Sequence, residues 1–374
     1  MLRIGIVAGE ASGDLLGSHL IEALKKKRAD IEFVGIAGPK MLRQGATSLF
    51  PIESLSVRGY IEVLKHLWGL LKLRRQLLNH FLDQPLDLFI GIDAPDFNFW
   101  LEKKLKKRGV KTIHYVSPSI WAWRKNRIKK IKKAVTEILA LFPFEPALYQ
   151  NAGVPVTYVG HPLADMLPME PNVVAARDVL KLDAKDLVVA MLPGSRQSEV
   201  QQHAHLFVEA AKLIYAERPD AKFLVPLITR ETRRIFELET FNEHDLPIDL
   251  LFGHAHDAME AADIVIVASG TATLETALLN VPQVVVYKTS AVSYFLGKML
   301  IKVPFISLVN LIAQKMVVKE LIQDELNSQN LATELQKITL NPASRENQIK
   351  EYRNIKSILG SIGASEKTGR RIVE

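Results

Sequence analysis

The strongest constraint on the fold is a regular alternation of short apolar runs with longer stretches of helical periodicity. The apolar runs, rich in Val, Ile and Leu, predict strands at 3–8, 32–37, 86–92, 111–116, 137–140, 155–158, 186–192, 221–226, 248–251, 264–268 and 283–287. These runs lack polar alternation, so we expect strands buried on both faces, as parallel strands are. Most intervening stretches are long enough for crossover helices. A proline-spaced stretch at 160–171 separates two such series.

This pattern predicts an α/β protein of two Rossmann-like, doubly wound domains facing a cleft. We expect one domain over 1–165, a second over 166–340, and a C-terminal helical tail over 341–374. With 48% apolar and 24% charged residues, the chain can bury a large core. The absence of cysteine excludes disulfides, thiolate nucleophiles and cysteine metal sites. Neither a signal peptide nor a run of about 18 apolar residues is present, which favours a cytoplasmic protein.

The first loop with unusual composition, GEASGD at 9–14, follows the first predicted strand. Its glycines permit close backbone approach, and Ser12 is expected to cap the next helix. Because Glu10 and Asp14 repel phosphate, the loop suits a sugar or acceptor hydroxyl better than a pyrophosphate. An ordinary capped turn is equally compatible with this sequence.

A second loop, GIDAPDFN at 91–98, places Asp93 where another apolar strand stops. A carboxylate with apolar neighbours and restricted solvent has a physical reason to be a stronger base than usual. Asp96 is expected to cap a helix over 97–107. That assignment argues against a metal site built on Asp93 and Asp96, and we predict no metal.

The third loop, LPGSR at 192–196, leads from a strand into a helix over 199–217. The N–H groups near Ser195 and the guanidinium of Arg196 are suitable donors for a diphosphate. A plain capped turn is the alternative.

The fourth loop, SGTATLE at 269–275, supplies another helix N-terminus in the same half. Ser269, Gly270 and Thr271 offer hydroxyl and N–H groups, and Glu275 can accept hydrogen bonds from a ribose diol. Two such loops in one half predict a nucleoside-diphosphate site.

Basic residues gather in one region of the chain. Between Arg58 and Lys133 there are 18 Lys and Arg against six Asp and Glu, whereas the whole chain carries +7. Within this region, 57–80 has a wide apolar arc flanked by cations, which is typical of an interfacial helix on an anionic membrane. The residues expected to face the membrane are Leu64, Leu67, Trp68 and Leu71. Complete burial of this helix is the alternative.

Eight sequence words, in order from Arg3 to about Glu325, resemble the lipid-A-disaccharide synthase family: GEASGD, GIDAPDFN, HYVSPSIWAW, FPFE, GHPLAD, LPGSR, SGTATLE and VVKELIQDE. The resemblance implies a UDP-sugar glycosyltransferase of the GT-B type. It implies transfer of 2,3-diacylglucosamine from UDP to the 6-hydroxyl of 2,3-diacylglucosamine 1-phosphate, yielding the β-1,6 disaccharide and UDP. Residues 1–165 would then face the acceptor and the membrane, and 166–340 would bind the donor.

The resemblance also implies roles for single residues. Asp93 would deprotonate the acceptor hydroxyl, so that the anomeric centre inverts, while Glu10 and Ser12 orient the acceptor. The residues implied to contact UDP are Ser195, Arg196, Ser269, Gly270, Thr271, Glu275 and Asn310. No divalent cation or other cofactor is required in this mechanism. The protein would associate peripherally with the cytoplasmic face of the inner membrane. The sequence leaves open whether it forms a homodimer.

Two alternatives compete with this interpretation. A related UDP-sugar protein, such as a non-hydrolysing 2-epimerase or another membrane-associated glucosaminyl transferase, would share the two-domain pattern. An epimerase would need additional acid/base carboxylates and no acyl-binding helix. A non-catalytic basic module for membranes or nucleic acid is the second alternative. The run RKNRIKKIKK at 124–133 contains no aromatic residue for base stacking, so we expect no nucleic-acid partner.

Trp121 and Trp123 suit an acyl pocket or core packing.

Overall fold

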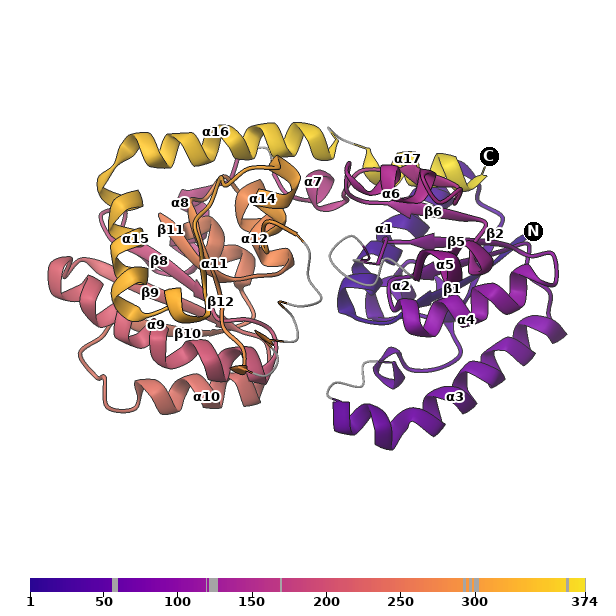
Figure 1. Cartoon of the computed structure of the whole chain (residues 1–374), viewed down its shortest axis with the longest axis horizontal. Coiled ribbons are helices and arrows are strands. Elements are labelled where there is room, and N and C mark those ends of the chain that lie inside the picture. Colours follow the sequence, from indigo (N-terminus) through magenta and orange to yellow (C-terminus); the bar gives the residue numbers. More distant parts are fainter. Residues whose placement is uncertain are drawn as a thin grey trace. The chain divides into compact units, whose positions relative to one another are not determined.

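The computed structural model describes residues 1–55, 60–118, 120, 127–168, 170–291, 294–295, 298, 303–360 and 363–373, without the side chains of 11, 60–67 and 373. Contacts divide the chain into two compact units. Unit 1 comprises Met1–Asp165 and Leu359–Glu374, and unit 2 comprises Met166–Ile358. Each unit is a parallel sheet covered by helices on its two faces (Figure 1).

Unit 1 contains a seven-stranded sheet in the order β3-β2-β1-β4-β5-β6-β7, with parallel pairing throughout. Its strands are β1 (Leu2–Ala8), β2 (Ile31–Ile36), β3 (Ala46–Ser48), β4 (Leu88–Ile92), β5 (Lys111–Tyr115), β6 (Glu137–Ala140) and β7 (Val156–Tyr158). Its helices are α1 (Ala11–Lys27), α2 (Pro39–Arg43), η1 (Ile52–Ser54), α3 (Tyr60–Asp83), α4 (Pro95–Lys106), α5 (Ile128–Ala134), α6 (Glu145–Gln150), α7 (Leu163–Met166) and α17 (Ala364–Val373).

Unit 2 contains a six-stranded parallel sheet in the order β10-β9-β8-β11-β12-β13. Its strands are β8 (Leu187–Leu192), β9 (Ala221–Leu227), β10 (Ile248–Phe252), β11 (Ile264–Ala268), β12 (Gln283–Tyr287) and β13 (Glu320–Ile322). Its helices are α8 (Val173–Val179), α9 (Gln197–Glu217), α10 (Arg230–Thr240), α11 (Ala255–Ala261), α12 (Thr271–Leu278), α14 (Leu308–Ala313), η3 (Gln323–Glu325), α15 (Ser328–Leu340) and α16 (Pro342–Leu359).

The prediction of two doubly wound α/β domains is confirmed, and every strand expected from the sequence forms. The central strands are almost wholly buried, as β8 and β11 show along their full lengths. This burial explains their uninterrupted apolar sequence, because helices cover a parallel sheet on both faces. The sequence pattern missed β3 and β13, which are three residues long and lie at sheet edges.

The C-terminal residues do not form a separate tail. Helix α16 belongs to unit 2 up to Ile358, whereas α17 belongs to unit 1. Gly369 of α17 lies close against α1, since a Cβ there would be 3.3 Å from the Cβ of Ala23. Ile372 joins the core of unit 1, and Arg371 pairs with Glu137 at 2.9 Å. The final helix therefore completes the core of the first unit.

Candidate functional site

The first two candidate loops meet at the switch point of the unit 1 sheet, where the strand order reverses between β1 and β4. These strands are paired, with Ala8 beside Ile92, so the loops that follow them are neighbours. A Cβ on Gly9 would lie only 2.4 Å from the Cβ of Ala94. Glycine is therefore needed at position 9 for the two loops to pack. Ligands of doubly wound sheets bind at such switch points.

The loop after β1 differs in detail from the sequence prediction. Helix α1 begins at Ala11 and its N-cap, Glu10, makes no side-chain cap; the expected Ser12 cap is wrong, because Ser12 lies inside the first turn. Glu10 and Ser12 are both exposed. Asp14 is instead buried and accepts hydrogen bonds from the N–H groups of Lys40 and Met41, at 2.9 Å each. Asp14 therefore fixes the start of α2.

Asp93 occupies a tight turn directly after β4. Asp93 and Ala94 have φ values of 53° and 43°, two successive left-handed residues, each costing about 1 kcal/mol or more. The Asp93 N–H donates to the carbonyl of Tyr115 at 3.0 Å, and Asn98 Nδ2 donates to the Asp93 carbonyl at 2.8 Å. The Asp93 side chain is half-buried, and no described residue donates to its carboxylate. These two bonds fix the backbone of the turn, and neither involves the Asp93 carboxylate.

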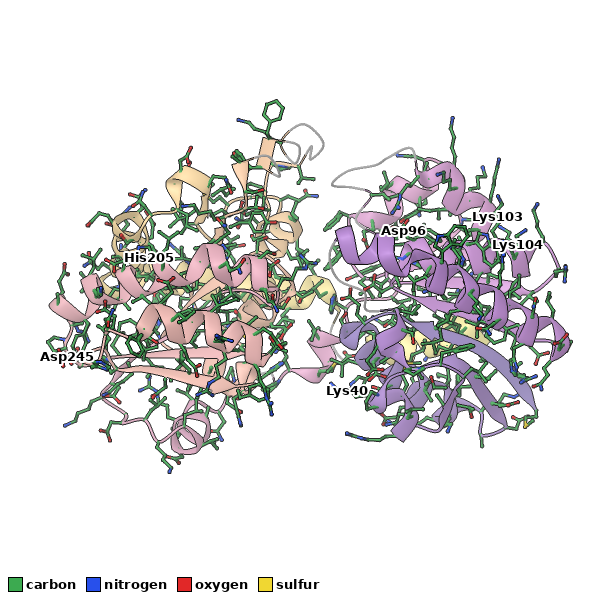
Figure 2. The ribbon with its side chains drawn as sticks, turned by 90° about the horizontal axis from the view of Figure 1, so that it is seen from below. Lys40, Asp96, Lys103, Lys104, His205 and Asp245 are labelled. Carbon is green, nitrogen blue, oxygen red and sulfur yellow. The ribbon has the colours of Figure 1, made fainter. Side chains whose placement is uncertain are left out.

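Asp96 does not cap α4, and that prediction is wrong. The N-cap position is Ala94 and the helix starts at Pro95, which puts Asp96 in the second helical position. Its carboxylate forms an ion pair with Arg127. Figure 2 shows Asp96 near one end of α4 and Lys103 and Lys104 near the other.

The third and fourth loops meet in the same way in unit 2. Its strand order reverses between β8 and β11, which pair with Leu192 beside Val267. The LPGSR and SGTATLE loops therefore leave adjacent strands at one edge of the sheet. The sequence predicted that these two loops serve one ligand, and the topology makes them neighbours.

The donors of the LPGSR loop converge on one carboxylate. Glu199 Oε2 accepts the N–H groups of Ser195 at 3.1 Å and Arg196 at 3.2 Å, and Glu199 Oε1 lies 3.1 Å from the Arg196 guanidinium. Gly194, with φ 117°, is required here, because a Cβ would lie 2.5 Å from Glu199 Oε2. The loop thus has the geometry of an anion site and already binds an internal anion.

His203 is a structural residue of this site that sequence analysis missed. It is wholly buried in α9, its Nδ1 lies 2.7 Å from the Pro193 carbonyl, and its Nε2 accepts the Lys288 N–H at 3.0 Å. Nδ1 must therefore carry the proton, and burial lowers the pKa of His203. The neutral ring ties the LPGSR loop to the end of β12. Its position on the apolar face of α9 was the only available signal.

In the SGTATLE loop, Gly270 and Thr271 are exposed at the start of α12, while the Ser269 hydroxyl donates to the Ile306 carbonyl at 2.9 Å. Glu275 pairs with His256 at 3.3 Å, and this hydrogen bond raises the pKa of His256. No sequence pattern indicates His256, because it comes from α11, a separate helix.

Asn310 is completely buried, and its amide is fully engaged. Its Oδ1 accepts the N–H groups of Val317 and Val318, at 2.7 and 3.0 Å. Its Nδ2 donates to the Val318 carbonyl at 2.9 Å and to Glu320 at 2.8 Å. These bonds hold α14 to the segment before β13, so any effect of Asn310 on a donor would pass through that segment.

Helix α3 has two distinct parts. Its C-terminal part is anchored in unit 1, because Leu77 and Phe81 are buried in the core. Trp68 is 81% exposed and Leu71 is half-buried, so complete burial of the helix does not hold. The structure does not describe the side chains of Leu64 and Leu67, the segment 57–59, Trp121 or Trp123.

His161, at the end of the first segment of unit 1, is buried, and this burial lowers its pKa to about 4.

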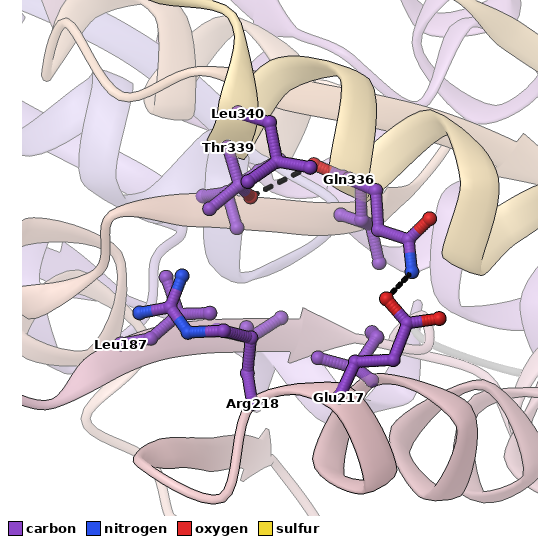
Figure 3. A pocket seen from close by; sticks show the side chains of 10 residues that line it. Leu187, Glu217, Arg218, Gln336, Thr339 and Leu340 are labelled. Atoms are coloured by element: carbon purple, nitrogen blue, oxygen red, sulfur yellow. Dashed lines mark hydrogen bonds between the residues drawn. The ribbon is translucent and has the colours of Figure 1, made fainter.

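One apolar cavity of about 200 Å³ lies in unit 2 (Figure 3). It is lined by Leu187 and Ile264, the first residues of β8 and β11, and closed by residues of α15 such as Leu340. The loops leave the opposite ends of those strands, roughly 15 Å away at the usual strand rise. The cavity is therefore separate from the candidate nucleotide site.

No helix in the part of the chain that the structure describes is long and apolar enough to cross a bilayer. Over the same residues, no three His, Asp or Glu side chains gather as a metal site would require.

Each unit is a doubly wound parallel sheet, and glycine-containing loops suited to ligand binding follow the strands at both switch points. This architecture defines the GT-B class of glycosyltransferase folds. Solved structures agree: the UDP-GlcNAc 2-epimerase from Neisseria meningitidis bound to UDP-GlcNAc has a TM-score of 0.67 at 12% identity, covering 100% of this chain and 98% of its own. A glycosyltransferase from Rickettsia africae has a TM-score of 0.57 at 12% identity, covering 100% and 96%. At such identity these likenesses show the fold alone.

Sequence relatives are more specific. The pattern of the family described as lipid-A-disaccharide synthetase matches residues 4–369. The lipid-A-disaccharide synthase of Methylobacillus flagellatus is 58% identical over 375 residues, covering 100% of this chain and 99% of the relative. The same enzyme of Dechloromonas aromatica is 52% identical over 376 residues, covering 100% and 98%. The chain belongs to the lipid-A-disaccharide synthetase family.

Proposed function

We propose that this protein transfers 2,3-diacylglucosamine from UDP to the 6-hydroxyl of 2,3-diacylglucosamine 1-phosphate, releasing UDP and the β-1,6 disaccharide. Its family makes it a UDP-sugar glycosyltransferase of lipid A disaccharide formation. The observation that carries the finer proposal is the turn at Asp93. That turn presents a carboxylate without a described donor at the switch point of unit 1.

Unit 2 would hold the donor. Its LPGSR loop already gathers two N–H groups and the Arg196 guanidinium around an anionic group, the Glu199 carboxylate. A diphosphate is also negatively charged, with more charge and more oxygens than a carboxylate, so it would take the place of Glu199, with Ser195, Gly270 and Thr271 beside it. Donors fixed in advance around a leaving group stabilise the charge that develops as the glycosidic bond breaks. Glu275, beside His256, would accept the ribose hydroxyls.

Unit 1 would hold the acceptor and supply the base. Asp93 would take the proton of the acceptor 6-hydroxyl as its oxygen attacks the anomeric carbon and the bond to UDP breaks. A single displacement of this kind inverts the anomeric centre. Glu10 and Ser12, exposed on the neighbouring loop, would orient the acceptor by hydrogen bonds to its hydroxyls.

The substrates carry acyl chains, so unit 1 would also contact the membrane, on its anionic cytoplasmic face. Trp68 is exposed on α3, and α3 packs on α4 through Trp100, with the Arg74 guanidinium 4.3 Å from the ring centre. Lys103 and Lys104 are exposed on α4, which favours anionic head groups. We expect Leu64, Leu67 and Leu71 to join Trp68 in this contact.

Incubation with UDP-2,3-diacylglucosamine and the monosaccharide 1-phosphate, followed by mass detection, tests the proposed function. We expect stoichiometric disaccharide and UDP. Isomerisation of the UDP-sugar without an acceptor would instead indicate an epimerase. UDP release without disaccharide would contradict the transfer.

A further inference from the structure

Beneath the Asp93 turn lies a cluster of three polar side chains that the proposed mechanism does not use. Asn98 and Glu102, one turn apart on α4, and His114 on β5 are all completely buried. His114 Nδ1 lies 2.7 Å from Glu102 Oε1, and the ring of Phe99 packs against the imidazole at a centroid distance of 4.5 Å. Polar groups this deep are costly unless each has a partner.

Gly91 is what admits this cluster. It pairs with His114 across β4 and β5, one strand position before Ile92 and the Asp93 turn. A Cβ at position 91 would lie 2.3 Å from Glu102 Oε1 and 2.9 Å from the Cβ of Asn98. The carboxyl group and the amide side chain therefore press against the same backbone, directly before the turn.

Three atoms of the cluster lack a partner among the described residues: Asn98 Oδ1, Glu102 Oε2 and His114 Nε2. If Glu102 were ionised, its Oε2 and Asn98 Oδ1 would both be acceptors without donors, deep in the core. A proton on Glu102 Oε2 turns one of them into a donor. Asn98 is the natural acceptor, because residues four apart share one helix face.

We propose that Asn98, Glu102 and His114 form a buried positioning cluster that holds the Asp93 backbone in its left-handed turn and so aims its carboxylate at the acceptor hydroxyl. In this cluster each hydrogen bond is donated toward the Asp93 turn. His114 Nδ1–H donates to Glu102 Oε1, Glu102 Oε2–H donates to Asn98 Oδ1, and Asn98 Nδ2–H donates to the Asp93 carbonyl. The last bond is 2.8 Å long. The inference rests on the proposed role of Asp93 as base.

Two further observations support the cluster. Burial raises the pKa of the Glu102 carboxyl, against the attraction of His114, as a proton on that group requires. The turn needs an external hold, because consecutive left-handed residues at Asp93 and Ala94 are unfavourable for side chains with a Cβ. Asn98 is the side chain that bonds the Asp93 carbonyl.

The test compares variants for kcat, for the KM of the UDP-sugar and for melting temperature. Asn98→Ala is expected to lower kcat by at least about tenfold, since small misplacements of a reacting group are costly. The KM for the UDP-sugar should change less than about twofold, because that substrate is held by unit 2. Thr112→Val is the matched control: Thr112 is also buried on β5 and donates to the Ala134 carbonyl at 3.1 Å. It should lower the melting temperature and leave kcat unchanged.

Substitutions of Glu102 test the direction of hydrogen-bond donation. They also test the cluster if Asn98→Ala fails to fold. Glu102→Gln keeps both an acceptor for His114 and a donor for Asn98, so kcat should stay near that of the parent. Glu102→Leu should lose turnover as Asn98→Ala does. Equal loss in both Glu102 variants, or equal kcat in Asn98→Ala and Thr112→Val, would overturn the cluster. The variant Asp93→Asn separates the two proposals. Normal turnover in Asp93→Asn would refute the role of Asp93 as the base. Lost turnover in Asp93→Asn together with normal turnover in Asn98→Ala would refute only the positioning role of the cluster.

Discussion

Replacing Glu199 by Gln tests whether the anion site of unit 2 is the diphosphate site. The Glu199 carboxylate accepts two backbone N–H groups, at 3.1 and 3.2 Å. A hydrogen bond to a charged acceptor contributes about 1.5–3 kcal/mol, against about 0.5–1.5 kcal/mol for a neutral one. The substitution therefore weakens the internal hold by about 1 kcal/mol per bond. The ion pair with Arg196 adds less than about 1 kcal/mol, because that side chain is 68% exposed.

UDP that must displace this side chain should bind the Glu199→Gln variant more tightly. A gain of about 1–2 kcal/mol corresponds to roughly five- to thirtyfold in affinity, since about 1.4 kcal/mol is tenfold. Stability of the UDP-free protein should fall by a similar amount, about 1–2 kcal/mol, because the same bonds include the capping box of α9.

Calorimetric titration with UDP measures the effect. Glu209→Gln is the control, because Glu209 lies on the same helix and pairs with Lys212 instead, at 2.8 Å. Arg196→Ala should weaken UDP binding by about 1–3 kcal/mol. If Glu199→Gln weakened binding as much as Arg196→Ala, Glu199 would be holding the loop in its binding form, and the displacement argument would be refuted.

Three further predictions concern the base, the membrane surface and pH. Asp93→Asn should keep the fold and UDP affinity and lower turnover by about 10²-fold or more, measured as disaccharide per minute; near-normal turnover would shift attention to Glu10. Trp68→Ser should reduce binding to anionic vesicles without lowering the melting temperature, whereas Leu77→Ala should cost about 2–5 kcal/mol of stability and leave flotation intact; the reverse pattern would make Trp68 a packing residue. His256→Asn should destabilise at pH 6 more than at pH 9, by less than about 1 kcal/mol because the His256 side chain is 54% exposed. The sign follows from its raised pKa: the stabilisation is complete below the unfolded value near 6.5 and disappears as pH rises through the folded one. Equal destabilisation at both pH values, in denaturant titrations, would contradict the pairing with Glu275.

Apolar periodicity predicted the sheets well because buried parallel strands need continuous runs of Val, Ile and Leu, as at Ile264–Ala268. It failed at Ala46–Ser48 and Glu320–Ile322, where three residues at a sheet edge need no such run. It also failed at the C-terminus. Whether a helix such as Ala364–Val373 returns to the first unit depends on the surface of α1, which local sequence does not encode.

The candidate loops were predictable for a related reason. A glycine-containing turn after a buried strand is a local pattern, and parallel topology then decides which loops meet. The sequence does not show which partner each side chain of a loop binds. The sequence predicts Asp14 as a ligand-facing acid and Asp96 as a helix cap, whereas in the structure Asp14 binds the N–H groups at the start of α2 and Asp96 pairs with Arg127. His256, His203 and Asn98 act through partners distant in sequence, so no spacing identifies them.

The likeness in fold to a UDP-GlcNAc 2-epimerase shows where the distinction between activities must lie. Both proteins have two doubly wound units, so the architecture cannot decide between epimerisation and transfer. A nucleotide site in unit 2 suits either reaction, because both act on a UDP-sugar. Transfer additionally requires a base for a second sugar, held rigidly in the other unit. We propose that the left-handed turn at Asp93, which Asn98 holds by a hydrogen bond to the Asp93 carbonyl, meets this requirement in unit 1. The buried cluster under that turn is therefore where substitutions should separate sugar transfer from UDP binding.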